Sequence, residues 1–356
     1  QTIRVVIILV GTTVVMATTK SVYSAGKMAL FGTVVCEVAG VLLLLWYMRK
    51  KTNLGQVEKI RLPIWPVIKE VTIFSVAISM SGLLLLCFQL VDSFTVYSML
   101  VQAGMPELEA MTLKGVYDRG QPLVQLGIVI ASSLSLAIVP LIAFKSKNLN
   151  GRGANPFIQL TYRASLIFGF AAALGLMLVM PYVNTMLFKT DALSRVLILY
   201  VLQIVPLSII LTFTAILQGY SKLLVPTLIL VGAIVMKCIG NILFIDSAGL
   251  MGVAVASNAA LFSAALLLIM YLKKFQKLKL ATFTFYKQLT LASLAMVIVV
   301  KGGALLLNSL FGGVPDSRLT SVFYSGVLIL VGAFTFITLI AKMRLLAVKE
   351  WFLIPA

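Results

Sequence analysis

The chain has 356 residues, of which 61% are hydrophobic and 11% charged, and its mean hydropathy is +1.08. Soluble domains carry a much smaller apolar share, so the composition predicts an integral membrane protein. The sequence contains no histidine, which excludes an imidazole proton relay or a histidine-ligated metal site within this chain. The three cysteines lie in apolar runs without paired spacing and are expected to be small apolar fillers.

Ten apolar runs follow one another along the chain, each close to the roughly 20 residues that a helix needs to cross a bilayer. None shows the alternation of a barrel strand, so the prediction is an all-α membrane protein with about ten spans. The spans are expected at roughly Thr2–Thr18, Lys27–Met48, Val71–Val101, Leu123–Phe144, Leu166–Phe188, Val196–Leu217, Pro226–Ile245, Leu250–Leu272, Leu289–Leu310 and Thr320–Ala341.

The distribution of basic residues predicts the orientation of these spans. If the spans alternate sides, twenty of the 29 Lys and Arg residues fall on the side of the first residue and seven on the other. This bias predicts that both ends of the chain lie in the cytoplasm. The net charge of +18 is then explained by topology and by contact with anionic membrane lipids. Nucleic-acid binding is not expected, because the basic residues sit in short loops at the membrane edge.

The stretch Tyr117–Pro122 places a carboxylate, a guanidinium and a proline at the head of the span predicted from Leu123 to Phe144. A guanidinium at membrane depth costs several kcal/mol unless it is solvated or paired, so such residues are candidates for a functional site. Arg119 is therefore expected either to face a ligand in a wet cavity or to cap a helix at the water interface.

Two further pairs of polar residues lie inside spans. Gln89 and Asp92 are three residues apart and Lys237 and Asn241 are four apart, so each pair shares a helix face. A buried carboxylate requires a cation, and for Asp92 that cation is expected to be either Lys237 or a metal ion. Asn258 is expected to form a hydrogen bond between helices.

Two segments of the chain have similar sequences, which we call the sequence echo. The segment Ser24–Ala29 reads SAGKMA and the segment Ser247–Gly252 reads SAGLMG, each at the head of a predicted span. The spans before them each carry one basic residue, Arg4 and Lys237. Such repeats are typical of transporters. If the two parts correspond, the chain is expected to begin inside a helix.

Two stretches carry a resemblance to a known family. Residues Gly115–Gly127 resemble the start of the eighth helix, and Leu217–Lys222 with Pro226 resemble the entry to the eleventh, in the multidrug/oligosaccharidyl-lipid/polysaccharide exporter superfamily. The resemblance is to its polysaccharide-type flippase branch, that of the lipid II flippase MurJ and its sporulation relatives of the SpoVB kind. It implies a fourteen-helix fold in two lobes, of which this chain would be the C-terminal two-thirds, without about four helices.

The resemblance also implies a division of the chain. Residues 1–48 would be the last two helices of the N-terminal lobe and residues 49–70 a basic cytoplasmic linker. Residues 71–272 would form the six-helix C-terminal lobe. A second basic linker would span 273–288, and residues 289–356 would hold two additional helices.

The implied function is that of a transporter, not an enzyme. It would flip a prenyl-pyrophosphate-linked saccharide, lipid II or a related cell-envelope precursor, across the bacterial cytoplasmic membrane by alternating access, as a monomer. The implied substrate-binding residues are Arg119, Asp118, Gln121 and Gln125. The chain departs from the family pattern at Pro122, where a glutamate is expected. No cofactor is implied beyond Na⁺ as a coupling ion, with Asp92, Asn241, Ser257 and the nearby Asp246 as the candidate cation site.

Two other functions remain open. A cation-coupled multidrug exporter of the same superfamily should have an apolar and acidic cavity, and Arg119 argues against that. A multispan membrane transferase should carry paired carboxylates or a histidine near the membrane edge. The only close acidic pair is Glu107 and Glu109, in the segment Gln102–Leu113, which is expected to be a short lid or a plain connector.

Overall fold

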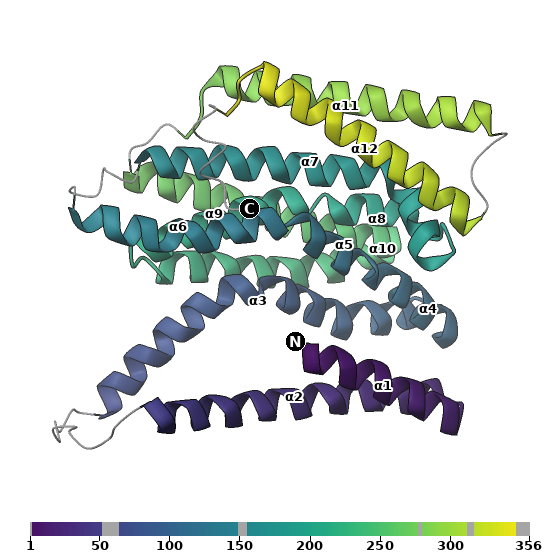
Figure 1. Ribbon diagram of the computed structural model, residues 1–356, viewed down its shortest axis with the longest axis horizontal. Helices are drawn as coiled ribbons and strands as arrows, with labels where there is room; N and C mark the ends of the chain where they lie inside the picture. The colour runs from purple at the N-terminus through teal and green to yellow at the C-terminus, as the bar shows by residue number, and fades with distance from the viewer. Residues whose placement is uncertain (1, 52–63, 149–154, 277–279, 312–316, 347–356) are drawn as a thin grey trace. The chain divides into compact units, whose positions relative to one another are not determined.

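The structure is a computed structural model that describes residues 2–51, 64–148, 155–276, 280–311 and 317–346 (Figure 1). The regular structure of these residues is entirely α-helical, so the predicted fold class is confirmed. The chain divides into two compact units, Gln1–Val67 and Ile68–Ala356. The finer division into lobes and linkers stays a prediction.

The first unit holds a pair of helices, α1 (Thr2–Thr19) and α2 (Val22–Lys51), which pack against each other (Figure 1). Between them lies Lys20, whose φ of 51° is left-handed and turns the chain out of α1. Most apolar side chains of both helices are exposed. Because all backbone hydrogen bonds of a helix lie within it, such an apolar surface tolerates contact with lipid.

The other ten helices of the described chain belong to the second unit, except for the first four residues of α3. They are α3 (Ile64–Gln102), α4 (Glu107–Asp118), α5 (Gly120–Gly127), α6 (Val129–Asn148), α7 (Asn155–Phe188), α8 (Ser194–Val201), α9 (Ile204–Gly219), α10 (Leu224–Gln276), α11 (Phe283–Leu310) and α12 (Arg318–Lys342).

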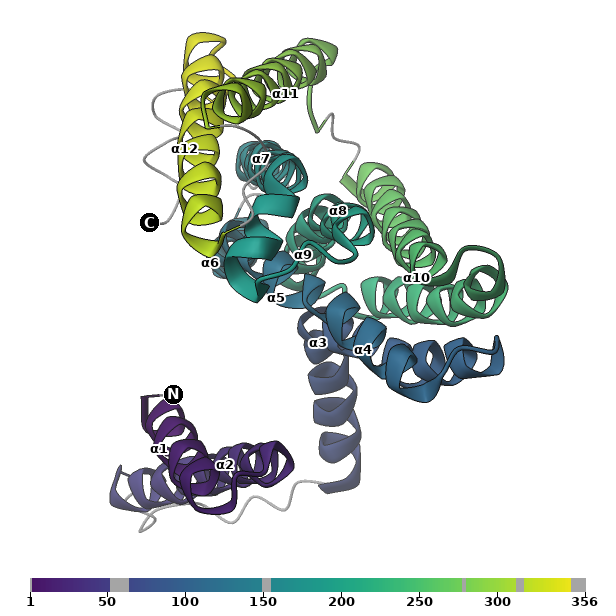
Figure 2. The same ribbon diagram turned by 90° about the vertical axis from the view of Figure 1, so that its right-hand side faces the viewer.

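Helix α9 is the centre of the second unit. It packs against α6, α7 and α10, and Figure 2 shows these helices around it. Because α9 is apolar on all sides, it can be buried in this way. Its few polar groups are satisfied within the bundle: the Thr212 hydroxyl lies 2.5 Å from the Ser165 hydroxyl of α7, and the Ser208 hydroxyl donates to the Ile204 carbonyl of its own helix.

Helix α10 is broken near its middle. Its 53 residues would make a rod of roughly 80 Å, at about 1.5 Å per residue, whereas the hydrocarbon core is about 30 Å thick. The break lies at Gly249, whose φ of 54° and ψ of −138° are not helical. Such angles suit glycine, which has no side chain to clash with the backbone. The two limbs match the predicted spans Pro226–Ile245 and Leu250–Leu272.

The count of spans is close to the prediction. Seven described helices are long and apolar enough to cross a membrane, and the bent pair Glu107–Gly127 and Val129–Phe144 makes eight if it is one span. Dividing α10 at Gly249 adds another, and the shorter apolar helix Arg4–Thr18 lies within the first predicted span. The described helices therefore provide a segment for each predicted span, and the chain is a multi-pass membrane protein.

The region around Arg119 differs from the prediction. The segment Gln102–Leu113 is not a plain connector over its whole length, because α4 begins at Glu107. Glu107 and Glu109 occupy the first turn of α4, where carboxylates are stabilised by the helix dipole. The helical stretch continues through α5 and bends by 46° at Ile128 before α6. Arg119 consequently lies between α4 and α5, inside this bent helical stretch and not at its start.

Helices α11 and α12 pack against each other and both contact α7 (Figure 1). The second predicted linker is largely helical at its ends, since α10 continues to Gln276 and α11 begins at Phe283. Thr282 caps α11: its hydroxyl accepts a hydrogen bond from the Phe285 backbone N–H. Residues 277–279 of this linker lie outside the described residues, as do 52–63 of the first.

Candidate functional site

A buried ion pair joins α3 to α10. The Lys237 ammonium lies 2.6 Å from Asp92 Oδ1, and the two side chains are only 0% and 4% exposed. Removing both charges from water is costly, and the pair is stable only if their remaining hydrogen-bonding capacity is also satisfied. The surroundings of the pair therefore decide whether it is complete.

Neighbouring oxygens and an amide form hydrogen bonds to this pair, although Asn241 Oδ1 is buried without a partner among the described residues. Lys237 Nζ also donates to the Ser257 hydroxyl at 2.5 Å and to the Val253 carbonyl at 3.4 Å. Asn241 Nδ2 donates to Asp92 Oδ1 at 2.8 Å and to the Thr95 hydroxyl at 2.9 Å. The ammonium thus has three oxygen partners, which is the number of its protons.

The break in α10 brings these residues together. Lys237 and Asn241 lie on the first limb and Val253 and Ser257 on the second, and the turn at Gly249 folds one limb onto the other. The limbs approach closely at Gly252, where an added Cβ would lie 2.2 Å from the Phe244 carbonyl oxygen. Small residues permit such close packing of helices in membranes.

The structure places three of the four candidate cation ligands in one cluster. Asp92, Asn241 and Ser257 surround Lys237, whereas Asp246 is exposed near the end of the first limb, away from them. Thr95 was not predicted as part of this site, although its spacing of three residues from Asp92 puts both on one face of α3. Asn258 forms the expected hydrogen bond between helices, from its Nδ2 to the Leu199 carbonyl of α8 at 2.8 Å.

The Asp118–Arg119 segment is arranged differently. Asp118 pairs with Lys114, one turn earlier in α4, and the ammonium lies 2.7 Å and 2.6 Å from its two carboxylate oxygens. This contact is partly exposed and lies within one helix. Although Asp118 and Arg119 are adjacent in sequence, the aspartate is thus paired with another cation.

The Arg119 guanidinium faces an aromatic ring. Its Cζ atom lies 4.5 Å from the centroid of the Phe188 ring, in cation–π distance. The side chain is half-buried, and its Nη1 has no hydrogen-bond partner among the described residues. Because a buried guanidinium nitrogen that lacks an acceptor is costly, this donor is suited to an anionic ligand.

The two glutamine candidates flank this position on α5. Gln121 is half-buried and Gln125 is exposed, and their spacing of four residues puts them on one face. Pro122 lies between them in the first turn of α5, where its missing N–H is tolerated. The structure therefore groups the four candidate substrate residues on the end of α4 and on α5, without a contact between their side chains among those described.

Tyr117 connects the two polar regions. It directly precedes Asp118, is fully buried, and packs edge-on against Tyr200 of α8 with ring centroids 5.0 Å apart. Both tyrosines lie within electrostatic reach of Asp92. Gly120 permits this packing, since a Cβ there would lie 2.5 Å from the Tyr200 ring. The Asp92 cluster and the Arg119 segment are thus neighbours in the fold.

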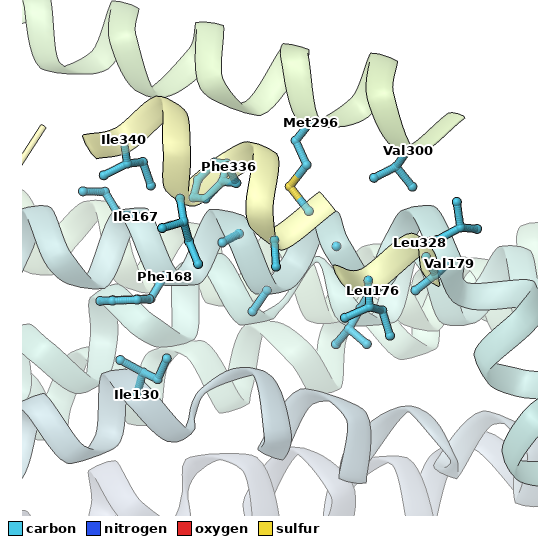
Figure 3. A pocket seen from close by; sticks show the side chains of 16 residues that line it. Ile130, Ile167, Phe168, Leu176, Val179, Met296, Val300, Leu328, Phe336 and Ile340 are labelled. Atoms are coloured by element: carbon cyan, nitrogen blue, oxygen red, sulfur yellow. The ribbon is translucent and has the colours of Figure 1, made fainter. Parts of the chain in front are cut away.

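An apolar cavity of about 390 Å³ lies between α6, α7, α11 and α12 (Figure 3). Figure 3 shows Ile130 on one side and Met296, Phe336 and Ile340 on the other, with Leu176 of α7 between them. All of its lining residues are apolar. Such a cavity suits a hydrocarbon chain and offers no hydrogen bond to a polar headgroup.

Comparisons with known proteins agree with this architecture. No family model matches the chain. Over 244 residues it is 32% identical to the uncharacterized membrane protein YabM of Bacillus subtilis (strain 168), a match that covers 67% of this chain and 46% of that protein. Among solved structures it is similar to the lipid II flippase MurJ in an inward closed conformation, with a TM-score of 0.65 and 17% sequence identity.

The structural match covers 96% of this chain and 66% of the flippase. The chain thus spans less than half of the relative YabM and less than two-thirds of MurJ. At this identity the match concerns the fold. The chain is a multi-pass, all-α membrane protein with the fold of MurJ.

Proposed function

We propose that this chain belongs to a transporter that flips a prenyl-pyrophosphate-linked saccharide across the bacterial cytoplasmic membrane by alternating access. The substrate class would be lipid II or a related cell-envelope precursor. The observation that carries the proposal is Arg119, a half-buried guanidinium in the bent helical stretch of a MurJ-like fold, with a nitrogen that has no partner among the described residues.

The chemistry of the headgroup explains why such an arginine is required. Moving a pyrophosphate through a membrane protein removes its hydration, so fixed cations have to replace the lost water. Arginine suits this task because its planar donors bind phosphate oxygens in pairs. Since Asp118 is paired with Lys114, the positive charge of Arg119 is available to a phosphate.

The apolar cavity supports the other half of the proposal. A prenyl-linked substrate carries a long hydrocarbon tail that does not need to leave an apolar environment. The cavity between α6, α7, α11 and α12 is lined only by apolar side chains and has room for part of such a tail. Cavity and guanidinium together fit an amphiphile with an anionic head better than a small cationic drug.

The ion pair between Asp92 and Lys237 is relevant to whether a sodium ion binds near Asp92. The site expected to bind Na⁺ contains Lys237 Nζ at hydrogen-bonding distance from both Asp92 and Ser257. We propose that Lys237 provides the positive charge that Asp92 requires, so that no sodium ion is needed there. The carboxylate of Asp246 lies apart from this cluster and is not proposed as a ligand.

The test is substitution of Arg119 in the full-length protein. Arg119→Ala should abolish complementation of a flippase-deficient strain at unchanged membrane abundance, and Arg119→Lys should restore little because bidentate geometry is lost. Lys189→Ala, an exposed basic residue close to Phe188, is the matched control and should retain activity. Full complementation by Arg119→Ala would contradict the proposal.

A further inference from the structure

A second cavity shares α7 and α11 with the apolar cavity of Figure 3 but none of its lining residues. Its volume is about 460 Å³, and it is bounded by α7, α9, the second limb of α10 and α11. None of the described residues that line it is charged, and four of them carry a hydroxyl group. We name it the tyrosine groove, after Tyr162 and Tyr286 at one end.

The tyrosine groove is long and runs along the helices. Its lining on α7 consists of one residue in every four, which form a single stripe: Tyr162, Leu166, Phe170 and Leu174. The stripe is roughly 18 Å long at about 1.5 Å per residue, and the lining of α11 from Tyr286 to Val297 is roughly 16 Å long. Half of the hydrocarbon core of a bilayer is about 15 Å thick. The groove is therefore about as long as an acyl chain in one membrane leaflet.

The groove is open along one edge. Phe262, Tyr286 and Leu294 line it and are 41%, 38% and 53% exposed. These residues lie on helices that are long and apolar enough to cross a membrane, and the exposed apolar surface of such helices tolerates lipid. A hydrocarbon chain can therefore enter the groove sideways from the bilayer.

A pair of tyrosine hydroxyls marks one end of the groove. The hydroxyl oxygens of Tyr162 and Tyr286 lie 2.9 Å apart, and the Tyr162 ring stacks on Phe213 of α9 with ring centroids 5.5 Å apart. Each hydroxyl has one proton, and only one of the two protons can form the bond between the oxygens. The other proton has no acceptor among the described residues. The pair can therefore donate one hydrogen bond to a ligand in the groove.

The depth of this hydroxyl pair in the membrane follows from the length of α11. The helix has 28 residues and is roughly 42 Å long at about 1.5 Å per residue, close to the roughly 40–45 Å of a bilayer with its headgroup regions. Tyr286 occupies the first turn of α11, so it is expected at the boundary between headgroups and hydrocarbon, where tyrosine is enriched. The ester carbonyls of membrane glycerolipids lie at the same depth.

Ser293 lies in the α11 wall of the groove, two helical turns beyond Tyr286. It is 8% exposed, and its buried hydroxyl has no hydrogen-bond partner among the described residues. A buried hydroxyl without a partner costs free energy, whereas a larger apolar side chain would remove that cost and fill the groove. A small residue at this position therefore keeps the groove wide enough for a hydrocarbon chain.

We propose that the tyrosine groove binds one acyl chain of a membrane glycerolipid, whose ester carbonyl accepts a hydrogen bond from the Tyr162–Tyr286 pair. A prenyl chain carries no such carbonyl, and its pyrophosphate would find no cation among the described residues of the lining. The bound acyl chain fills space between α11 and the helices α9 and α10, and so holds α11 to the core of the second unit. The inference does not depend on which substrate is transported.

The first test compares two lipids that differ only in the carbonyl. Diester phosphatidylcholine should raise the melting temperature of the full chain in detergent micelles more than the diether lipid with the same chain length and headgroup, because only the diester offers an acceptor. Tyr162→Phe/Tyr286→Phe should remove this difference and weaken the apparent affinity for the diester lipid about two- to tenfold. The control Tyr271→Phe removes a hydroxyl near the end of α10, outside the groove, and should keep the difference.

The second test fills the groove. Ser293→Leu should remove the stabilisation by both lipids, because the larger side chain occupies the path of the acyl chain. The lipid-free variant should melt at no lower temperature than the unsubstituted protein, since an unpaired buried hydroxyl is lost. Ser309→Leu is the matched control, because it makes the same change at an exposed position near the end of α11, and it should leave the lipid effect unchanged.

Three results would overturn the proposal. Equal stabilisation of the unsubstituted protein by the diester and diether lipids, or a difference that survives in the tyrosine variant, would exclude the carbonyl as the ligand. A full lipid effect in Ser293→Leu would place the lipid elsewhere on the surface. Stabilisation by a prenyl alcohol that equals that of the diester lipid and is lost in Ser293→Leu would assign the groove to an isoprenoid chain. If the double tyrosine variant does not fold, Tyr286→Phe alone decides, because that side chain is exposed.

Discussion

Two neighbouring regions of this molecule each contain an aspartate and basic side chains, and they differ in how the charges are paired. In the cluster between α3 and α10, Asp92 and Lys237 are fully buried and neutralise each other across two helices. In the segment between α4 and α5, Asp118 pairs with Lys114 of its own helix, and Arg119 keeps a nitrogen without a partner among the described residues. In the first region the two charges are paired with each other, although Asn241 Oδ1 beside them has no partner among the described residues, and in the second the Arg119 guanidinium is suited to bind an anion.

The comparison shows that adjacency in sequence is a poor guide to pairing. Asp118 and Arg119 are neighbours in the chain but point to different partners, because successive residues on a helix face different directions. Asp92 and Lys237 are far apart in sequence, yet their helices bring them to 2.6 Å. We therefore propose a structural role for the buried pair and a ligand-binding role for Arg119.

The largest expected effect on stability comes from breaking the buried pair. Asp92→Asn or Lys237→Met alone should lower the free energy of unfolding by about 3–5 kcal/mol, because each leaves an uncompensated buried charge. The double variant should lose much less than the sum, since no charge is then buried alone. Unfolding titrations in mixed detergent micelles measure all three.

The partly exposed Lys114–Asp118 pair serves as the control for the buried Asp92–Lys237 pair in that experiment. Because it is partly exposed and spaced by four residues, Lys114→Met should cost at most about 0.5 kcal/mol. An equal cost for Lys114→Met and Lys237→Met would show that burial does not distinguish the two regions. A double variant as unstable as the two single variants combined would show that Asp92 and Lys237 do not interact.

A smaller effect is expected at the break that builds the buried cluster. Gly249→Ala should destabilise the protein by about 1–3 kcal/mol, because its φ of 54° with ψ of −138° is strained for any residue with a side chain. Gly26, its counterpart in the sequence echo, lies inside α2 with no atom within 4 Å of an added Cβ. Gly26→Ala should therefore stabilise α2 by about 0.5–1 kcal/mol. Melting temperatures of the two variants that shift in the same direction would contradict this difference.

Much of the fold could be predicted because apolar run length alone indicates a membrane helix. The break in α10 was also predictable, since the residues around Gly249 separate two apolar runs. The helix α4 was not predicted, because its charged residues Glu107, Glu109 and Lys114 resemble a connector. In the structure those glutamates occupy the first turn of α4, directly after Pro106. Acidic residues at these positions favour the start of a helix, so this pattern could have identified α4 from the sequence.

The candidate site was predictable only in part. The polar residues of the spans could be read from the sequence, and spacing showed which of them share a face. Which helix faces which depends on how α3 meets the first limb of α10 and how the second limb folds back on it, and no local pattern encodes that. Asp246 was grouped with Asp92 by resemblance alone, and the structure leaves it exposed. The similar segments Ser24–Ala29 and Ser247–Gly252 likewise have different backbone conformations. Gly26 lies inside a helix, whereas Gly249 lies at a break in one.

The central claim is that the positive charge facing Asp92 belongs to the chain, and a sodium titration of thermal stability tests it most directly. Ligands that bind the folded state raise the melting temperature by mass action. The unsubstituted full-length protein should show the same melting temperature in sodium and in potassium at equal ionic strength. Lys237→Ala should gain a sodium-dependent rise, because Asp92, Asn241 and Ser257 then surround a vacated position. A rise with sodium in the unsubstituted protein that Asp92→Asn abolishes would contradict the account.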